Sequence, residues 1–155
     1  MEIKIIKCGL RFYLATSLRH VREVTGVNSQ IDPLTHFLMW DFDEIPLPIV
    51  IDSLKYVQGM FNLPPISIVQ TKENSYHGYC FRASSFLEAR GIIGFTPNVD
   101  RHYHSIGSGR GYFTLRFTDV KGQEFKHVMI LPSDIKPDLD YKDINSFVSY
   151  TKVVK

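Results

Sequence analysis

The sequence of 155 residues has little cysteine, little charge imbalance and no long hydrophobic run. Its two cysteines, Cys8 and Cys80, form no C-x-x-C pair and are too few for a disulfide framework, so we expect free thiols in a reducing compartment. No apolar stretch approaches the roughly 18 residues that a membrane-spanning helix needs. The first residues, MEIKIIKCGLRFYL, lack the apolar segment and cleavage site of a secretory signal. We therefore predict a cytoplasmic protein that does not enter a membrane.

The charge of the chain is nearly balanced, with 18 Lys and Arg against 16 Asp and Glu and a net charge of +2. A protein that only cradles phosphate groups is usually more basic. An enzyme whose acidic metal site is offset by a basic groove fits this balance better. The length suits one compact domain, and the sequence has no internal repeat or Gly/Ser linker, so we predict a single catalytic domain over residues 1–155.

Patterns of apolar residues predict an α+β domain. The segment 36–43 is short, apolar and aromatic, as a buried strand should be, and apolar residues recur every three or four positions across 46–62, as on one face of a helix. The predicted core is a strand (36–43), a helix (46–62), two strands (66–71 and 75–82), a helix (84–94) and a strand (112–118). This order is the ferredoxin-like or RRM-like βαββαβ pattern, in which both helices cover one face of an antiparallel sheet and leave the other face for chemistry.

The flanks of this core are predicted from weaker patterns. A strand at 3–7 and a helix near 17–25 precede it, and a strand at 124–131 and a helix near 141–152 follow it. The stretch 96–111, which contains a Gly-rich run, is predicted to be irregular.

Three carboxylates are candidates for a metal site. Asp41 and Asp43 end the first core strand, and alternation places both on one face, where their oxygens could hold a hard divalent cation. The same D-x-D pattern at Asp138 and Asp140 is predicted to be a solvated turn, so the pattern alone decides little. The first pair differs because it follows a buried aromatic run, where unpaired charge is costly. Asp100 precedes the strand expected to lie beside the first one, so it could complete a two-metal site.

A second set of side chains suits a nucleoside triphosphate. Ser75 and His77 share one face of a core strand, just after a turn that contains Lys72. Arg116 lies between apolar neighbours on the last core strand and cannot easily be fully solvated. Arginine and lysine bind phosphate oxygens, and a hydroxyl and an imidazole complete a plausible cradle.

Two further arginines are predicted to contact a nucleic-acid strand. Arg110 lies among glycines that let a ligand approach the backbone, and Arg82 ends a core strand. The aromatic content of 13% suits a dense core and also supplies side chains that could stack on bases.

In this order and spacing, the residues resemble the archaeo-eukaryotic primase superfamily of primase-polymerases. The matching motifs are the apolar run with D-x-D at FLMWDFD, the S-x-H motif at Ser75 to His77, the apolar-acid pair Val99 and Asp100, and an arginine-bearing strand at TLR (114–116). The resemblance covers about residues 36–118. The segment before Ser75 lacks the glycines common in that family, and no cysteine-histidine zinc module is present.

The resemblance implies a minimal catalytic core that transfers nucleotides by two-metal phosphoryl transfer. It implies that Asp41, Asp43 and Asp100 hold two Mg²⁺ or Mn²⁺ ions. It further implies a single-stranded DNA template, nucleoside triphosphates and a helicase or other replication protein as partners, in a mobile element, virus or plasmid.

Two other functions remain open. His102 and His104 resemble the H-U-H metal motif of rolling-circle replication initiators, for which Tyr141 or Tyr150 could be the nucleophile. A non-catalytic RRM-like module that stacks aromatic side chains on bases is the third possibility.

Overall fold

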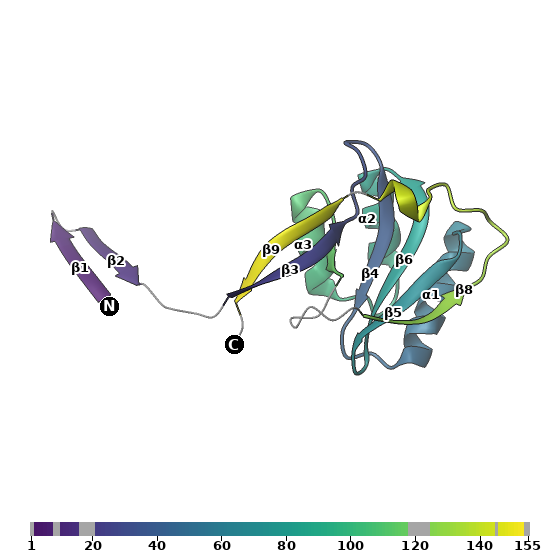
Figure 1. Ribbon diagram of the computed structural model, residues 1–155, viewed down its shortest axis with the longest axis horizontal. Helices are drawn as coiled ribbons and strands as arrows, with labels where there is room; N and C mark the ends of the chain where they lie inside the picture. Colours follow the sequence, from purple (N-terminus) through teal and green to yellow (C-terminus); the bar gives the residue numbers. More distant parts are fainter. Residues whose placement is uncertain (1, 8–9, 16–20, 118–124, 145, 154–155) are drawn as a thin grey trace.

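The computed structural model describes residues 2–7, 10–15, 21–117, 125–144 and 146–153. The elements in this part of the chain are β1 (Glu2–Lys7), β2 (Leu10–Ala15), β3 (Val21–Asn28), β4 (His36–Phe42), α1 (Leu47–Phe61), β5 (Ile66–Lys72), β6 (Ser75–Ser84), α2 (Phe86–Phe95), α3 (Arg101–Arg110), β7 (Thr114–Arg116), β8 (Lys126–Leu131), η1 (Tyr141–Asp143) and β9 (Phe147–Val153). β1 pairs with β2 alone, and the other strands form a three-stranded and a four-stranded antiparallel sheet (Figure 1). None of the helices in these ranges is both long and apolar enough to cross a membrane.

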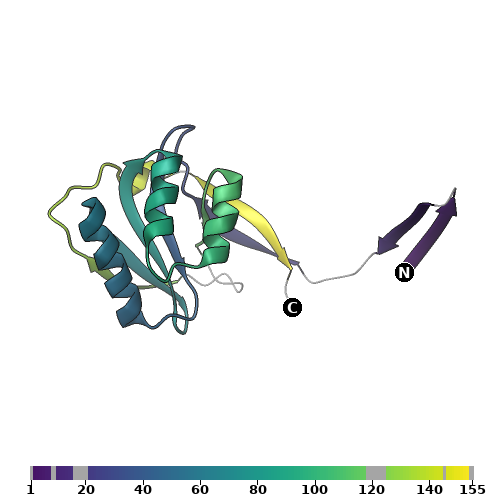
Figure 2. The ribbon, with the colours of Figure 1, turned by 180° about the vertical axis from the view of Figure 1, so that it is seen from behind.

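The four-stranded sheet has the strand order β4-β6-β5-β8. Its strands β4, β5 and β6, with helices α1 and α2, reproduce the first five elements of the predicted βαββαβ core in their predicted order. The predicted α+β, ferredoxin-like architecture with flanking elements is therefore confirmed. Figure 2 shows α1, α2 and α3 side by side on one face of this sheet.

The main core lies between the sheet and these helices. Leu38, Trp40 and Phe42 are fully buried at alternate positions of β4, as the two-residue period of a strand requires. The Trp40 indole N–H donates to Thr96 Oγ1 at 2.8 Å, which fixes the end of α2 to the centre of β4. Gly78 of β6 leaves room for Trp40, because a Cβ there would lie 3.2 Å from the indole ring.

The opposite face of the sheet is less open than the sequence predicted. An apolar hollow of about 230 Å³ lies between the two sheets. Its lining includes Phe37 and Tyr79 of the four-stranded sheet, together with Val27 of β3, Phe117 at the end of β7 and Phe147 of β9. The three-stranded sheet thus covers part of this face.

The predicted irregular stretch at 96–111 contains helix α3, so that prediction was wrong. Asp100 is the N-cap of α3: its Oδ1 accepts the backbone N–H groups of His102 at 2.6 Å and Tyr103 at 2.9 Å. Gly111 ends the helix with a φ of 84°, the left-handed conformation that glycine adopts most easily. The glycines within α3 favour a loop locally, and the cap and the packing of the helix outweigh them.

The predicted last core strand is short and pairs with a different partner. β7 pairs with β3 rather than with β4, as the register of Leu115 with Val27 shows. The free edge of β4 is already occupied, since Met39 O accepts the Tyr103 hydroxyl at 3.0 Å and Asp41 O accepts the Asp100 N–H at 2.8 Å. Because these edge carbonyl groups are bonded to the start of α3, β4 has no free edge at which β7 could pair.

The flanking predictions were right for strands and wrong for helices. β1 and β8 confirm the strands predicted at 3–7 and 124–131, although residue 124 lies outside the described ranges. The predicted helix near 17–25 overlaps β3, and residues 16–20 are outside those ranges. The predicted helix at 141–152 is the short turn η1 followed by β9, which pairs with β3 along its length. Both segments are strands because each pairs with a partner more than a hundred residues away in the sequence, and local sequence patterns do not encode such pairing.

The buried Cys80 is a free thiol, as predicted. Burial raises its pKa to about 12, so it is unreactive at neutral pH. Cys8 lies outside the described residues.

Candidate functional site

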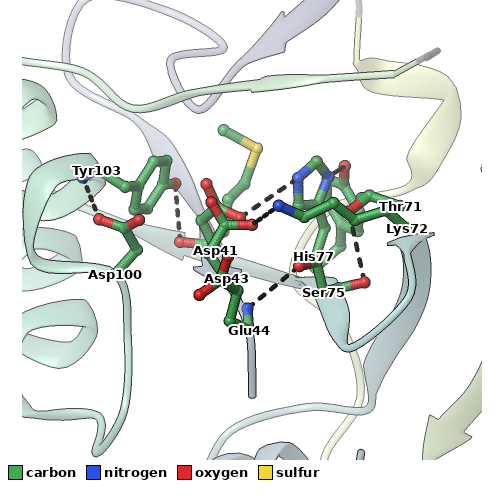
Figure 3. Close-up of polar contacts among 11 residues, drawn as sticks. Asp41, Asp43, Glu44, Thr71, Lys72, Ser75, His77, Asp100 and Tyr103 are labelled. Carbon is green, nitrogen blue, oxygen red and sulfur yellow. Dashed lines mark hydrogen bonds and ion pairs between the residues drawn. The ribbon is translucent and has the colours of Figure 1, made fainter. Parts of the chain in front are cut away.

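The predicted site residues meet at one end of the four-stranded sheet. Figure 3 shows Asp41 and Asp43 at the end of β4, Lys72, Ser75 and His77 at the β5–β6 turn, and Asp100 before α3. Two antiparallel ladders and the edge contact of α3 with β4 bring these segments together.

Asp41 is the central carboxyl group of this site. Its side chain is 24% exposed, and Asp41 lies opposite His77 in the β4–β6 register. Burial, followed by the charges of Asp43 and Asp100, raises the pKa of Asp41 to about 7. The charges of Arg116 and Lys72 oppose this rise and do not cancel it. The carboxyl group is therefore near half-ionised at neutral pH in the absence of a bound cation.

His77 contacts this carboxyl group as a neutral ring. Its Nε2 lies 3.5 Å from Asp41 Oδ1, and its Nδ1 lies 3.2 Å from the Tyr79 hydroxyl. Burial and, to a smaller extent, the charge of Arg116 lower the pKa of His77 to about 3. Burial also raises the pKa of Tyr79, which keeps its hydroxyl a donor. When Tyr79 donates to Nδ1 of the neutral ring, the proton of that ring lies on Nε2, the nitrogen nearer to Asp41.

Asp43 and Lys72 form an exposed ion pair. Lys72 Nζ lies 3.3 Å from Asp43 Oδ1, and about half of each side chain is exposed. Such pairs contribute little to stability because water screens them. Lys72 can therefore leave Asp43 for another anion at low cost.

Ser75 supports the turn that carries Asp43. Its buried hydroxyl oxygen accepts the backbone N–H of Glu44 at 3.2 Å, and Glu44 has a φ of 59°, in the left-handed region. The predicted contacts of Ser75 and His77 with a triphosphate stay predictions, since protein groups occupy their polar atoms here.

Asp100 approaches Asp41 as predicted, but by a different route. We expected a neighbouring strand to bring it there, and the N-cap of α3 does so instead. Both helix amides bind Oδ1 of Asp100. Among the described residues no hydrogen bond uses its Oδ2, which remains available to a ligand.

The predicted arginines have three different environments. Arg116 is half-buried on β7, and its charge lowers the pKa values of both Asp41 and His77, so it acts directly on the site. Arg110 is exposed at the end of α3, away from the acids. Arg82 lies at the other end of β6, where it donates to Phe61 O at 2.7 Å and Glu88 Oε1 at 2.6 Å. Its guanidinium is therefore engaged in holding α1 and α2.

The second D-x-D pattern is a turn, as predicted. Asp138 Oδ2 accepts the N–H of Ala83 at 3.1 Å, and Asp140 Oδ1 accepts the N–H of Lys142 at 3.0 Å. Both residues are exposed.

The rolling-circle hypothesis places its histidines on one strand, whereas the structure places them on a helix. Residues two apart on a helix point about 200° away from each other, so His102 and His104 cannot share a metal ion as an H-U-H pair does. His104 instead packs on Phe113 with its ring centroid at 6.0 Å and contacts the Arg90 carbonyl at 3.1 Å. Tyr141 lies in η1, and the side chain of Tyr150 is outside the described part of the structure.

Two tyrosines that the sequence analysis did not single out support the site. Tyr79 fixes His77, and Tyr103 fixes α3 to β4. The spacing of Tyr79 two residues after His77 places both on one face of β6 and could have indicated the first contact. The contact of Tyr103 depends on α3, which the sequence did not predict.

The site has the chemistry of a divalent cation site without being assembled as one. In the described ranges, no three His, Cys, Asp or Glu side chains are arranged to hold a metal ion. After burial, the charges of the other two carboxylates, Asp43 and Asp100, raise the pKa of Asp41, and a cation would relieve that repulsion. Their oxygens are the ligands that Mg²⁺ and Mn²⁺ prefer. Metal binding by these residues stays a prediction, since Lys72 occupies Asp43 in this structure.

Comparison of the chain with protein-family models, curated proteins and solved structures finds no match.

Proposed function

We propose that this chain is a nucleotidyltransferase of the primase-polymerase type, which extends a strand from nucleoside triphosphates on a single-stranded template. The convergence of three carboxylates with Lys72 and Arg116 at one end of the sheet carries this proposal. That combination suits phosphoryl transfer, in which acids hold cations and basic side chains bind the phosphates.

The acids would hold two divalent ions, Mg²⁺ or Mn²⁺. Asp41 and Asp43 would supply ligands from the end of β4, and Asp100 would supply its unused Oδ2. When bound, such ions neutralise the charge on the transferred phosphoryl group and favour ionisation of the attacking hydroxyl. His77 would keep Asp41 oriented through its neutral Nε2–H.

The basic side chains would bind the triphosphate. Lys72 would exchange Asp43 for a phosphate oxygen, which frees Asp43 for a cation in the same step. The positive charge of Arg116 already lowers the pKa values of Asp41 and His77, and its planar guanidinium suits a phosphate. Nucleotide binding and cation binding are thereby coupled. The phosphate takes the positive charge of Lys72 away from Asp43, and the cation balances the negative charge that Asp43 is left with.

The proposed setting is the cytoplasm, in the replication of a mobile element, virus or plasmid. The proposed partners are single-stranded DNA, nucleoside triphosphates and a helicase or other replication protein. These partners follow from the resemblance in the sequence.

The test is primer synthesis and primer extension on single-stranded DNA with nucleotides and Mn²⁺ or Mg²⁺. We expect Asp41→Asn to reduce nucleotide addition at least about a hundredfold, the loss typical of removing one charge-stabilising group from an active site. Asparagine keeps the shape of the side chain and its contact with His77, so the loss would report the missing carboxylate. Asp52→Asn, on the exposed side of α1, is the matched control and should extend primers as the wild type does.

Three results would contradict the proposal. Wild-type activity in Asp41→Asn would remove the carboxylate from the mechanism. A covalent tyrosine–DNA adduct would favour the rolling-circle alternative. DNA binding by the wild type without synthesis or an adduct would favour a non-catalytic module.

A further inference from the structure

A polar hollow of about 630 Å³ lies where α2 passes into α3. Residues 94–99, Arg101 and His104 line it. This lining includes an arginine and a histidine and no carboxylate, so its charge favours an anion. None of the residues assigned to the acidic site lines it.

The connection that lines the hollow is fixed to two neighbouring elements. Thr96 Oγ1 accepts the Trp40 indole N–H at 2.8 Å and donates to Ile92 O at 2.9 Å. Asn98, with a φ of 60°, donates from Nδ2 to Ser53 Oγ of α1 at 3.0 Å. The lining is therefore held on β4 and α1, and a ligand would meet a preformed surface.

Arg101 supplies an uncommitted positive charge at the hollow. It is exposed, and within the part of the chain that the structure describes it makes no hydrogen bond or ion pair. A guanidinium in this state can bind a phosphate group through two parallel hydrogen bonds without first releasing a partner.

Phe95 supplies an aromatic surface at the same hollow. Its side chain is half-exposed and lines the hollow, whereas its ring neighbours Tyr56 and Phe61 do not. The Tyr56 ring stacks on Phe95 at a centroid distance of 6.1 Å and an angle of 14°, and the Phe61 ring meets it edge-on at 5.7 Å. Phe95 is thus supported from outside the hollow, and a base can stack on a ring held in this way.

The hollow adjoins the acidic site. Val99 and Arg101 line it on either side of Asp100, whose N–H donates to the carbonyl of Asp41 at 2.8 Å. A strand whose end reached the acids could therefore continue into the hollow.

We propose that this hollow binds one nucleotide of a single-stranded nucleic acid, with a phosphate on Arg101 and a base on Phe95. The continuation of that strand to the acids rests on the proposed function. Binding itself requires neither a metal ion nor a nucleoside triphosphate.

The test is fluorescence anisotropy of labelled oligothymidylate and oligouridylate with the full chain, in a chelator and without nucleotides, over a series of salt concentrations. Arg101→Gln should reduce the steepness of log K against log[salt] by about 0.7, the contribution of one phosphate contact on a single strand. Phe95→Leu should weaken binding about tenfold and leave that slope unchanged, because stacking releases no counterions. Arg90→Gln is the matched control: Arg90 is exposed on α2 and does not line the hollow, so the slope should fall less than in Arg101→Gln.

Absence of binding by the wild type would overturn the proposal. So would wild-type binding by both hollow variants, or an equal loss of slope in Arg90→Gln. A preference for either oligonucleotide would support it and identify the sugar that the hollow accepts. The result for Arg101→Gln stands even if Phe95→Leu lowers the melting temperature, because Arg101 is exposed. Binding is measured in a chelator and without nucleotides, so a failure of nucleotide addition and a failure of this site are distinguishable.

Discussion

Both ends of the β4–β6 pair carry charged side chains, but the two ends differ in how far these charges are paired. At the acidic end Lys72 pairs with Asp43, whereas Asp41 has no lysine or arginine in ion-pair contact among the described residues. At the matched end, Arg82 donates to Phe61 O at 2.7 Å and to Glu88 Oε1 at 2.6 Å. At the acidic end, burial and neighbouring carboxylates raise the pKa of Asp41 to about 7. A fold satisfies its polar groups unless binding or chemistry requires otherwise. The difference therefore indicates that the matched end stabilises the fold, whereas the acidic end costs stability. Under the proposed function, that cost keeps the acids available to a ligand.

Substitution at the matched end should have the larger effect on stability. Arg82→Met keeps the length of the side chain and removes both donors, leaving the carbonyl of Phe61 and the carboxylate of Glu88 without them. We expect the free energy of unfolding to fall by about 2 kcal/mol, as for the loss of charge-assisted hydrogen bonds. Urea unfolding followed by circular dichroism measures this change.

Arg82→Lys sharpens the same comparison. Lysine keeps the charge and cannot reach two acceptors with a planar fork, so we expect an intermediate loss. Nucleotide addition by both variants should stay near the wild-type rate when the protein is folded. A loss of that activity without a loss of stability would mean that the matched end also has a role in binding, as predicted from the sequence for Arg82.

At the acidic end, substitution should increase stability. The pKa of Asp41 in the folded state, about 7, lies above the ordinary aspartate value of 3.8, so the folded state binds the proton more tightly than the unfolded state. The resulting stabilisation is fully present below pH 3.8 and is lost as the pH rises towards 7. Asp41→Asn removes this charge, and we expect it to increase the free energy of unfolding by about 1–2 kcal/mol at about pH 8, less than the full shift implies because the side chain is partly solvated.

The measurement is urea unfolding of the wild type and Asp41→Asn at about pH 8 and about pH 5, without divalent cations. The gain should be much smaller at the lower pH, where Asp41 is mostly protonated. The lowered pKa of His77 also makes stability depend on pH, but that contribution is shared by both proteins and cancels in the difference. Asp52→Asn should change stability equally at both pH values. An Asp41→Asn protein less stable than the wild type at the higher pH would show that neighbouring groups stabilise the ionised Asp41 carboxylate in the folded state.

The elements around both ends could be predicted from the sequence because their signals are local. A short apolar and aromatic run predicts β4, and apolar residues at a spacing of three and four predict α1. Ser85 caps α2 by accepting the N–H of Glu88 at 3.2 Å. The elements that were missed depend on distant partners. β9 is a strand because β3 pairs with it, and α3 persists despite its glycines because Asp100 and Tyr103 bind it to β4.

The candidate site shows the same division. The approach of Asp100 to Asp41 was predicted correctly from an incorrect topology, since a helix cap replaces the expected strand. What the sequence could not provide is the state of each polar group. Only the packed structure reveals that Nδ1 of His77 is bonded to Tyr79 while Nε2 lies 3.5 Å from Asp41, or that Ser75 supports a turn rather than facing solvent.

The smallest predicted effect compares two serines at opposite ends of β6. Ser75 is buried at the acidic end, and its oxygen accepts the Glu44 N–H at 3.2 Å. Ser84 is 5% exposed at the matched end, and its hydroxyl has no hydrogen-bond partner among the described residues. Ser75→Ala should lower the free energy of unfolding by about 1 kcal/mol, since it leaves an N–H without its acceptor. Ser84→Ala should be neutral or slightly stabilising, because it removes a polar atom that is buried without a bond.

The two variants delete the same atom from the same strand, so the difference between them isolates the hydrogen bond. Urea unfolding of both variants under identical conditions measures it. Ser75→Ala should also release the turn that carries Asp43 and raise the divalent cation concentration needed for nucleotide addition, which Ser84→Ala should leave unchanged. If both serines proved equally important for stability and neither affected that concentration, the acidic end would have no special dependence on the Asp43 turn. The contrast between the two ends would then depend on the carboxylates alone.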